Sequence, residues 1–172
     1  MARPRRLDPQ RILSTLVERD VQFVVIGAIA AIAQGGPLIT EDLDITPARE
    51  PDNLERLATA LKELDARLRI PNDSSGNEFP IEPRFLGSLD SWTLKTPSGD
   101  IDLLFAPFGT AGYEDLKRGA VSAELWDHPV LVASLPDLIR MKEAAGRPKD
   151  ISQLPALRQT LELRRERERG QS

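Results

Sequence analysis

The residues of this chain whose type and spacing could do chemistry begin with three carboxylates in a stretch that otherwise reads as a β-strand. The stretch L-I-T-E-D-L-D-I-T-P-A, residues 38–48, contains Glu41, Asp42 and Asp44. Aspartate is depleted in strands because its short polar side chain competes for backbone hydrogen bonds and cannot fill a core. The presence of these acids therefore needs an explanation other than packing.

An extended backbone separates the acids from the apolar residues between them. Successive side chains point to opposite faces, so Asp42 and Asp44 share one face. Leu43 and Ile45 share the other face and can anchor the strand in the core. Two carboxylates held close together repel unless a cation lies between them, and Mg²⁺ binds such oxygen ligands together with substrate phosphates. The pattern predicts a metal site, and Glu41, on the anchor face, is not assigned to it.

A second acidic strand repeats the arrangement. The run D-I-D-L-L-F begins at Asp100, directly after Gly99. If this strand lies beside the first, Asp102 joins Asp42 and Asp44 in a triad able to hold two metal ions, which suits phosphoryl or nucleotidyl transfer. Asp100 is interpreted as a turn residue because aspartate is common in turns.

The rest of the sequence predicts the elements that position these acids. Capping residues and helical spacing predict a helix that begins at Pro9 after the cap Asp8, and further helices over 28–34, 51–64, 112–121, 135–145 and 148–169. Ser134 is the predicted cap of the helix over 135–145, and Gly146 is predicted to end it. Short β-branched or alternating runs predict strands over 21–27, 38–48, 92–96, 100–105 and 129–133. Residues 71–83 are turn formers and predict a surface loop. This order indicates an α/β (α+β) fold, a small mixed sheet flanked by helices.

Length and composition fit one folded domain over 1–172, with a core at about 20–134 and C-terminal helices at about 135–169. Hydrophobic residues make up 40% and charged residues 29%, as in ordinary globular proteins. The absence of cysteine excludes zinc fingers and cysteine nucleophiles, and it is compatible with a reducing cytoplasm. Without a membrane-length apolar run or the apolar segment of a signal peptide, we expect a cytoplasmic protein with no membrane partner.

The two ends of the chain are basic and its body is acidic. The net charge is −4, residues 1–7 contribute +3 and residues 158–172 contribute +2, which leaves about −9 on the body. We interpret the basic ends as solvated, flexible segments, with a role in holding nucleic acid as the alternative.

Four parts of the chain together resemble a known family. A strand ending in Gly27-Ala28, then T-E-D-L-D-I from Thr40, then I-D-L around Asp102, resembles the signature of the DNA polymerase β-like nucleotidyltransferase superfamily. The run V-V-I-G-A-I-A-A is similar to the small bacterial AbiEii-like nucleotidyltransferases of toxin–antitoxin and abortive-infection systems. The stretch K-E-A-A-G-R-P-K-D-I-S-Q-L, residues 142–154, resembles the basic element of those proteins, with Asp150 expected to cap the last helix. The resemblance covers about residues 20–160.

This resemblance implies an Mg²⁺-dependent nucleotidyltransferase that moves an NMP from an NTP to a hydroxyl on a tRNA 3′ end or a protein, with a cognate antitoxin as a further partner. It implies that Asp42, Asp44 and Asp102 are the catalytic residues and hold two Mg²⁺ ions, which Mn²⁺ can replace. The implied nucleotide-binding residues are Gly27, Ala28, Thr40, Lys142, Arg147 and Lys149. Small residues where a strand passes to a helix let a phosphate approach the backbone, and cations neutralise triphosphate charge.

Two departures and two alternatives stay open at the level of sequence. Ala28 stands where the family usually has Gly or Ser, and Gln153 stands where the basic element often has Asp. One alternative is a non-catalytic nucleotide or nucleic-acid binding module that keeps the fold. The other is a nucleotide-sugar glycosyltransferase, although such proteins usually need a longer chain.

Overall fold

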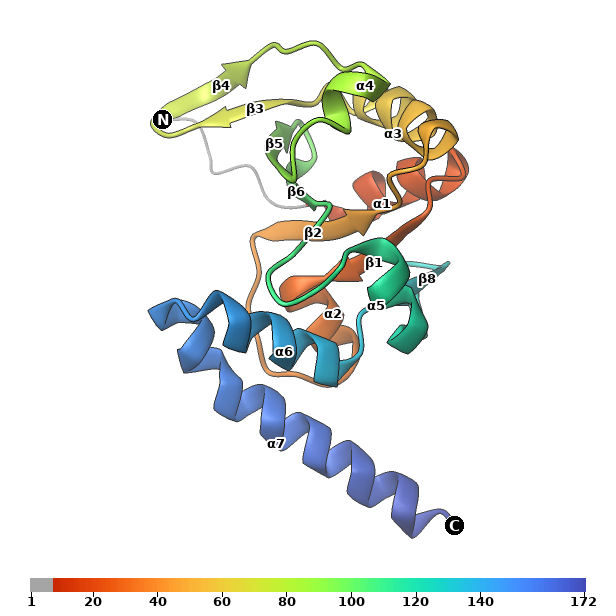
Figure 1. The fold of residues 1–172 in the computed structure, drawn as a ribbon, viewed down its shortest axis with the longest axis vertical. Coiled ribbons are helices and arrows are strands. Elements are labelled where there is room, and N and C mark those ends of the chain that lie inside the picture. Colours follow the sequence, from red (N-terminus) through yellow and green to blue (C-terminus); the bar gives the residue numbers. More distant parts are fainter. Residues whose placement is uncertain (1–7) are drawn as a thin grey trace.

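The computed structural model describes residues 8–172, which form an eight-stranded sheet with helices packed around it (Figure 1). The basic residues Arg3, Arg5 and Arg6, assigned above to an N-terminal segment, lie outside the described residues. The helices are α1 (Pro9–Glu18), α2 (Gly27–Ala33), α3 (Pro51–Glu63), α4 (Pro83–Leu86), α5 (Tyr113–Gly119), α6 (Leu135–Ala145) and α7 (Pro148–Gly170). The strands are β1 (Phe23–Ile26), β2 (Asp42–Pro47), β3 (Arg67–Ile70), β4 (Asp73–Asn77), β5 (Ser91–Thr96), β6 (Gly99–Leu104), β7 (Val121–Leu125) and β8 (His128–Val132).

The sheet is mixed and its strand order is β4-β3-β5-β6-β2-β1-β8-β7. Strand β2 pairs in parallel with β6, and β1 pairs in parallel with β8; the other neighbours are antiparallel. The mixed sheet that the sequence predicted is confirmed, and its central strands β6, β2 and β1 carry the acidic and glycine motifs.

The core lies between the sheet and the apolar faces of its helices. Leu43, Ile45, Ile101 and Leu103 of the two acidic strands are fully buried, as are Ile12 and Leu16 of α1 and Leu57 and Leu61 of α3. In Figure 1, β1 and β2 lie between α1 and α3 on one side and α6 on the other. Burial of one strand face fixes the register of the acids on the opposite face.

Three helix ends follow the capping residues that the sequence predicted. The Asp8 carboxylate accepts a hydrogen bond from the Arg11 backbone N–H at the start of α1, and Ser134 accepts one from the Asp137 backbone N–H at the start of α6. Gly146 ends α6 with φ 63°, a left-handed conformation that glycine adopts without strain. The long C-terminal helix is also confirmed, from Pro148 onward.

The predicted surface loop at 71–83 is wrong in part, because residues 73–77 form strand β4 in a hairpin with β3. Its sequence D-S-S-G-N carries no apolar alternation, since β4 lies at the edge of the sheet. An edge strand gains backbone hydrogen bonds without having to bury its side chains.

Strand β7 was not predicted, although it pairs with the predicted strand β8. The turn between them consists of Trp126 and Asp127, both with positive φ, as in a type I′ hairpin turn. Type I′ turns usually contain Asn-Gly or Asp-Gly, and the Trp126-Asp127 turn contains neither pair.

Strand β2 is shorter than the predicted strand over 38–48, because it begins at Asp42. Residues 35–41 cross from α2 to β2 as an irregular segment in which the Ile39 side chain is 93% exposed. Glu41 therefore precedes the strand and is exposed to solvent.

Within residues 8–172, no helix is both long enough and apolar enough to cross a membrane.

Candidate active site

The parallel pairing of β2 with β6 brings the two acidic motifs side by side. Asp42 lies opposite Asp100, and Asp44 lies opposite Asp102. The alternation predicted from the sequence is confirmed, because the intervening apolar side chains are fully buried while the aspartates lie half-buried on the other face. Acids on neighbouring strands at matched positions converge on one point of the sheet.

Three of these carboxylates form a group that could hold a metal ion. Asp42, Asp44 and Asp102 each offer an oxygen, and these three oxygens lie within 4.8 Å of one another. Asp100 is outside this group. It is also part of β6 rather than the preceding turn, so its interpretation as a turn residue is wrong; the turn is made by Pro97 and Ser98.

Burial and mutual repulsion disfavour the ionised form of all three acids. Burial, followed by the Asp102 and Asp42 charges, raises the pKa of Asp44 to about 7. Burial also raises the pKa of Asp42 and of Asp102, although the nearby Arg69 guanidinium opposes both shifts. A divalent cation would offset this repulsion. Carboxylate oxygens are ligands that Mg²⁺ and Mn²⁺ prefer, so the three acids fit either ion.

Arg69, on β3, is a site residue that the sequence did not reveal. Its Nη2 donates to Oδ1 of Asp102 at 2.9 Å, and its Nη1 lies 3.1 Å from Oδ2 of Asp100. The side chain is 28% exposed. Residues 67–70 lie outside the strands that the sequence predicts, and nothing in the local sequence indicates that they approach β6.

Gly27 begins α2 directly after β1 and lies against the acids. Its φ is 67°, and a Cβ at this position would collide with the Asp44 carboxylate. The position therefore requires glycine for its backbone conformation and for the space that it leaves. Ala28 follows as the second residue of the helix.

Thr40 lies just before β2 and its hydroxyl is engaged by the backbone of Asp42. Thr40 Oγ1 donates to the Asp42 carbonyl at 2.7 Å and accepts from the Asp42 N–H at 3.2 Å. The structure thus places Thr40 at the entry to the strand, where it orders the first aspartate, and not among the residues that line the cleft beside the triad.

A cleft of about 340 Å³ opens beside the triad. One wall is formed by the three aspartates and Gly27, and the facing wall comes from α6 and the start of α7. Apolar and basic side chains line the rest of it: Ile26, Leu104, Phe108, Leu138, Met141, Ala145, Lys142, Arg147 and Lys149. The Phe108 side chain is 65% exposed, which leaves an aromatic surface at the rim. The cleft therefore combines acidic, basic and apolar surfaces.

The basic residues predicted to bind nucleotide meet around a buried acid. Asp150 accepts hydrogen bonds from Lys142 Nζ at 3.2 Å and from Arg147 Nε at 2.7 Å, and it is 2% exposed. Although burial opposes ionisation, these donors hold the pKa of Asp150 below its ordinary value. Lys149 makes no ion pair within residues 8–172. It is the cation of this group left available to an anionic ligand.

Asp150 is not the cap of α7, contrary to the sequence prediction. The N-cap is Arg147, and Asp150 is the third residue of the helix. Pro148 accounts for the difference, since proline favours the first helical position and leaves the residue before it as the cap.

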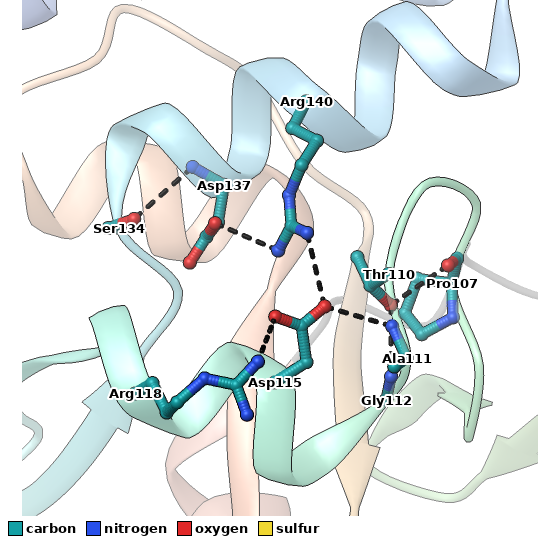
Figure 2. Close-up of polar contacts among 9 residues, drawn as sticks. All are labelled: Pro107, Thr110, Ala111, Gly112, Asp115, Arg118, Ser134, Asp137 and Arg140. Carbon is teal, nitrogen blue, oxygen red and sulfur yellow. Dashed lines mark hydrogen bonds and ion pairs between the residues drawn. The ribbon is translucent and has the colours of Figure 1, made fainter.

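A network of charged residues holds α6, which carries Lys142, against α5 (Figure 2). The Asp115 carboxylate accepts hydrogen bonds from Arg140 at 3.1 Å, from Arg118 at 3.0 Å and from the Ala111 backbone N–H at 2.9 Å. Arg140 also donates to Asp137, one turn back on α6. The network orders the loop that leads from Phe108 to α5 as well as the helix.

Solved structures with a similar fold include proteins named as nucleotidyltransferases. The chain is similar to the antibiotic-resistance factor ANT(2″)-Ia in complex with adenylyl-2″-tobramycin, with a TM-score of 0.58, 18% identity and coverage of 89% of this chain and 87% of that one. It is similar to LnuA, a lincosamide antibiotic adenylyltransferase bound to lincomycin, with a TM-score of 0.60, 11% identity and coverage of 90% and 98%. It is also similar to a Thermotoga maritima protein assigned as a nucleotidyltransferase, with a TM-score of 0.54, 17% identity and coverage of 87% of this chain and 92% of that one.

No protein-family model and no curated protein sequence matches the chain. The structural similarities confirm the fold class that the sequence predicted: this is a mixed α/β chain with the nucleotidyltransferase fold and a C-terminal helix. The narrower resemblance to the AbiEii-like group stays a prediction.

Proposed function

We propose that this chain is a metal-dependent nucleotidyltransferase that moves an NMP from an NTP to a hydroxyl acceptor. The observation that carries the proposal is the convergence of Asp42, Asp44 and Asp102 from two parallel strands on a cleft that Lys142, Arg147 and Lys149 also line. The structural neighbours support it, because the names of two of them describe adenylyl transfer.

In this proposal Asp42, Asp44 and Asp102 hold Mg²⁺, or Mn²⁺ in its place. Bound there, the metal would supply charge stabilisation at the phosphates and orient the attacking and leaving oxygens. Asp102 also accepts the proton of the acceptor hydroxyl. One of its oxygens is already bound to Arg69, so the other is the one that remains for these tasks.

The nucleotide occupies the cleft with its triphosphate toward the basic wall. Lys149 and the Lys142–Arg147 pair neutralise phosphate charge as pyrophosphate leaves, and Gly27 and Ala28 leave the backbone accessible beside the acids. The ion pairs that Lys142 and Arg147 make with Asp150 hold both cations at the edge of the cleft. A bound triphosphate then meets positive charge that is already in position.

Two classes of acceptor are supported by different observations. The sequence resemblance favours a tRNA 3′ end or a protein hydroxyl, together with a cognate antitoxin. The structural neighbours named for tobramycin and lincomycin favour a small hydroxylated molecule. We therefore state the acceptor as a hydroxyl group and leave its class to the experiment.

The test is transfer of label from each α-labelled NTP in the presence of Mg²⁺. Total cell RNA, cell protein, an aminoglycoside and a lincosamide would be supplied as separate acceptors. We expect label on one acceptor with one preferred NTP, and loss of at least 100-fold in rate for Asp42→Asn and Asp44→Asn, since each removes a charged ligand. Glu41→Gln is the matched control: it changes the adjacent carboxylate, which is exposed and outside the triad, and should keep most activity.

Two outcomes would contradict this assignment. If Glu41→Gln abolished transfer as fully as Asp42→Asn, the choice of Asp42 and Asp44 over Glu41 as metal ligands would be wrong. If wild type and Asp44→Ala gave the same null result on every acceptor while NTP still bound, the chain would be a nucleotide-binding module that keeps the fold.

A further inference from the structure

Arg69 reaches two acids on a strand that is not its neighbour. In the sheet, β5 lies between β3, which carries Arg69, and β6, which carries Asp100 and Asp102. Strands are about 4.8 Å apart, so the side chain must span roughly 10 Å across the sheet. Thr93 of β5, which pairs with Asp102 in the register, belongs to the strand that Arg69 has to cross.

The two contacts use the forked shape of the guanidinium. Nη2 donates a hydrogen bond to Asp102 Oδ1 at 2.9 Å, and the buried Nη1 forms an ion pair with Asp100 Oδ2 at 3.1 Å without a hydrogen bond to any of residues 8–172. A planar fork with fixed donors can hold two carboxylates at once, whereas a lysine ammonium offers one point charge. Arg69 thus connects one triad member to the acid that stays outside the triad.

We propose that Arg69 is a positioning residue that orients Asp102 for its role in the triad and keeps Asp100 out of the metal site. Four carboxylates face the same side of two adjacent strands, but only three converge. Arg69 pairs with both acids of β6, and in this proposal it holds Asp100 beside the guanidinium while the second oxygen of Asp102 stays available to the triad. It does not line the cleft, so it acts through Asp102 and not by contact with the nucleotide. The predicted changes in kcat and KM rest on the proposed function. The predicted change in Mn²⁺ affinity rests on the geometry of Arg69 and the acids alone.

The first test is Arg69→Met in the full chain, with Mn²⁺ affinity measured by electron paramagnetic resonance titration in the absence of NTP. Removing the cation leaves four carboxylates without their counter-charge and releases Asp100. We expect Mn²⁺ to bind about 3–10-fold more tightly. Asp100→Asn added to Arg69→Met should return the affinity to near the wild-type value, since it removes the released acid.

The kinetic test separates orientation from charge. We expect Arg69→Met to lower kcat about 10–100-fold while the KM for NTP changes less than threefold, because Asp102 loses its orientation while the basic residues proposed to bind the triphosphate are unchanged. Arg69→Lys should restore the Mn²⁺ affinity, since it restores the charge. It should restore kcat only in part, since it cannot fork between two acids.

Arg67→Met provides the matched control on the same strand. Arg67 also pairs with two acids, Asp65 at 3.8 Å and Glu78 at 3.6 Å, but neither belongs to the triad. We expect wild-type kcat, KM and Mn²⁺ affinity for this variant. Thermal unfolding of each variant would identify any general loss of the β3–β4 hairpin.

Weaker Mn²⁺ binding in a folded Arg69→Met, or a kcat within twofold of wild type, would overturn the proposal. If wild type shows no transferase activity on any acceptor, the proposal for Arg69 is tested by the Mn²⁺ titrations of Arg69→Met and of its double variant with Asp100→Asn alone. The failure of the proposed function is therefore distinguishable from the failure of this inference.

Discussion

At the scale of single residues, the site depends on a carboxylate that burial makes difficult to ionise and on a glycine that leaves room for it. The Asp44 carboxylate is repelled by the charges of Asp102 and Asp42, and it lies against Gly27. Its pKa is raised to about 7 by burial and by its acidic neighbours. The same convergence that would attract a cation therefore destabilises the metal-free chain.

This raised pKa predicts how the stability of the metal-free protein depends on pH. Between the ordinary aspartate pKa of about 4 and the folded value near 7, the folded chain binds more protons than the unfolded chain, so its stability falls as pH rises through that window. We expect Asp44→Asn to raise the free energy of unfolding by roughly 1–3 kcal/mol at pH 8 and by little at pH 4.5. Urea denaturation with a chelator measures both values. Equal effects at both pH values would contradict the shift.

Gly27 supports a second prediction at this scale. Gly27→Ala places a Cβ against the Asp44 carboxylate in a left-handed backbone conformation that alanine adopts only with strain. We expect at least a 100-fold loss of transfer and a loss of about 1–2 kcal/mol in stability. Ala28→Ser, at the next residue and without positive φ, is the control for stability and should keep the wild-type free energy of unfolding. A normally active Gly27→Ala would show that Asp44 does not need this position.

At the scale of elements, the cleft depends on how firmly α6 is held. Helix α6 contributes Leu138, Met141 and Lys142 to the cleft, and Arg140 ties it to Asp115 of α5 (Figure 2). Hydrogen bonds from the Ala111 N–H and from Arg140 keep the pKa of Asp115 below its ordinary value. The loop that carries Phe108 is ordered by the same carboxylate.

Asp115→Asn should therefore loosen α5, α6 and the loop between β6 and α5 together. We expect a loss of about 2 kcal/mol in the free energy of unfolding at pH 7, since charged hydrogen bonds are replaced by weaker ones. A group with a lowered pKa contributes its full stability above the ordinary value of about 4 and loses it as pH falls through the lowered pKa of the folded chain, so the difference between the two proteins should shrink as the pH is lowered below about 4. Arg118→Met, at a 73% exposed partner, should cost far less. A similar loss from both variants would show that Asp115 acts as an ordinary surface charge.

At the scale of the whole molecule, the site joins parts of the chain that are far apart in sequence. Residues 42–44 and 100–102 meet in the middle of the eight-stranded sheet, and residues 138–150 close the cleft from the C-terminal helices. A ligand held by all of these segments binds only the folded chain, so it shifts the folding equilibrium as a whole.

Metal binding should therefore stabilise the entire chain. At an Mg²⁺ concentration ten times the dissociation constant, the linkage amounts to about 1.4 kcal/mol, or roughly 3–5 °C in Tm. Differential scanning fluorimetry with and without Mg²⁺ would measure the shift, and we expect it to disappear in Asp42→Asn and Asp44→Asn. Glu41→Gln should retain it. A shift that persisted in the triad variants would place the metal elsewhere.

Sequence alone determined the features that depend on neighbours along the chain. The alternation of Asp42, Leu43, Asp44 and Ile45 predicted which side chains face the core, because the period of two is a property of any strand. Asp8, Ser134 and Gly146 predicted helix ends, because capping is a local hydrogen-bonding or backbone effect. The resemblance predicted the nucleotidyltransferase fold, and the structural similarities confirm it.

Tertiary structure alone decided which charges meet. Asp100 and Asp102 lie two residues apart and face the same side of β6, yet Arg69 pairs with both and only Asp102 joins the triad. Asp150 fits a helix cap by sequence, but the fold buries it between Lys142 and Arg147. The physical reason is that strand order and helix packing arise from backbone pairing and burial between distant segments. The residues next to each charged side chain in the sequence do not indicate these long-range contacts. The edge strand β4, built from D-S-S-G-N, shows the same limit, since it is defined by its partner and not by its side chains.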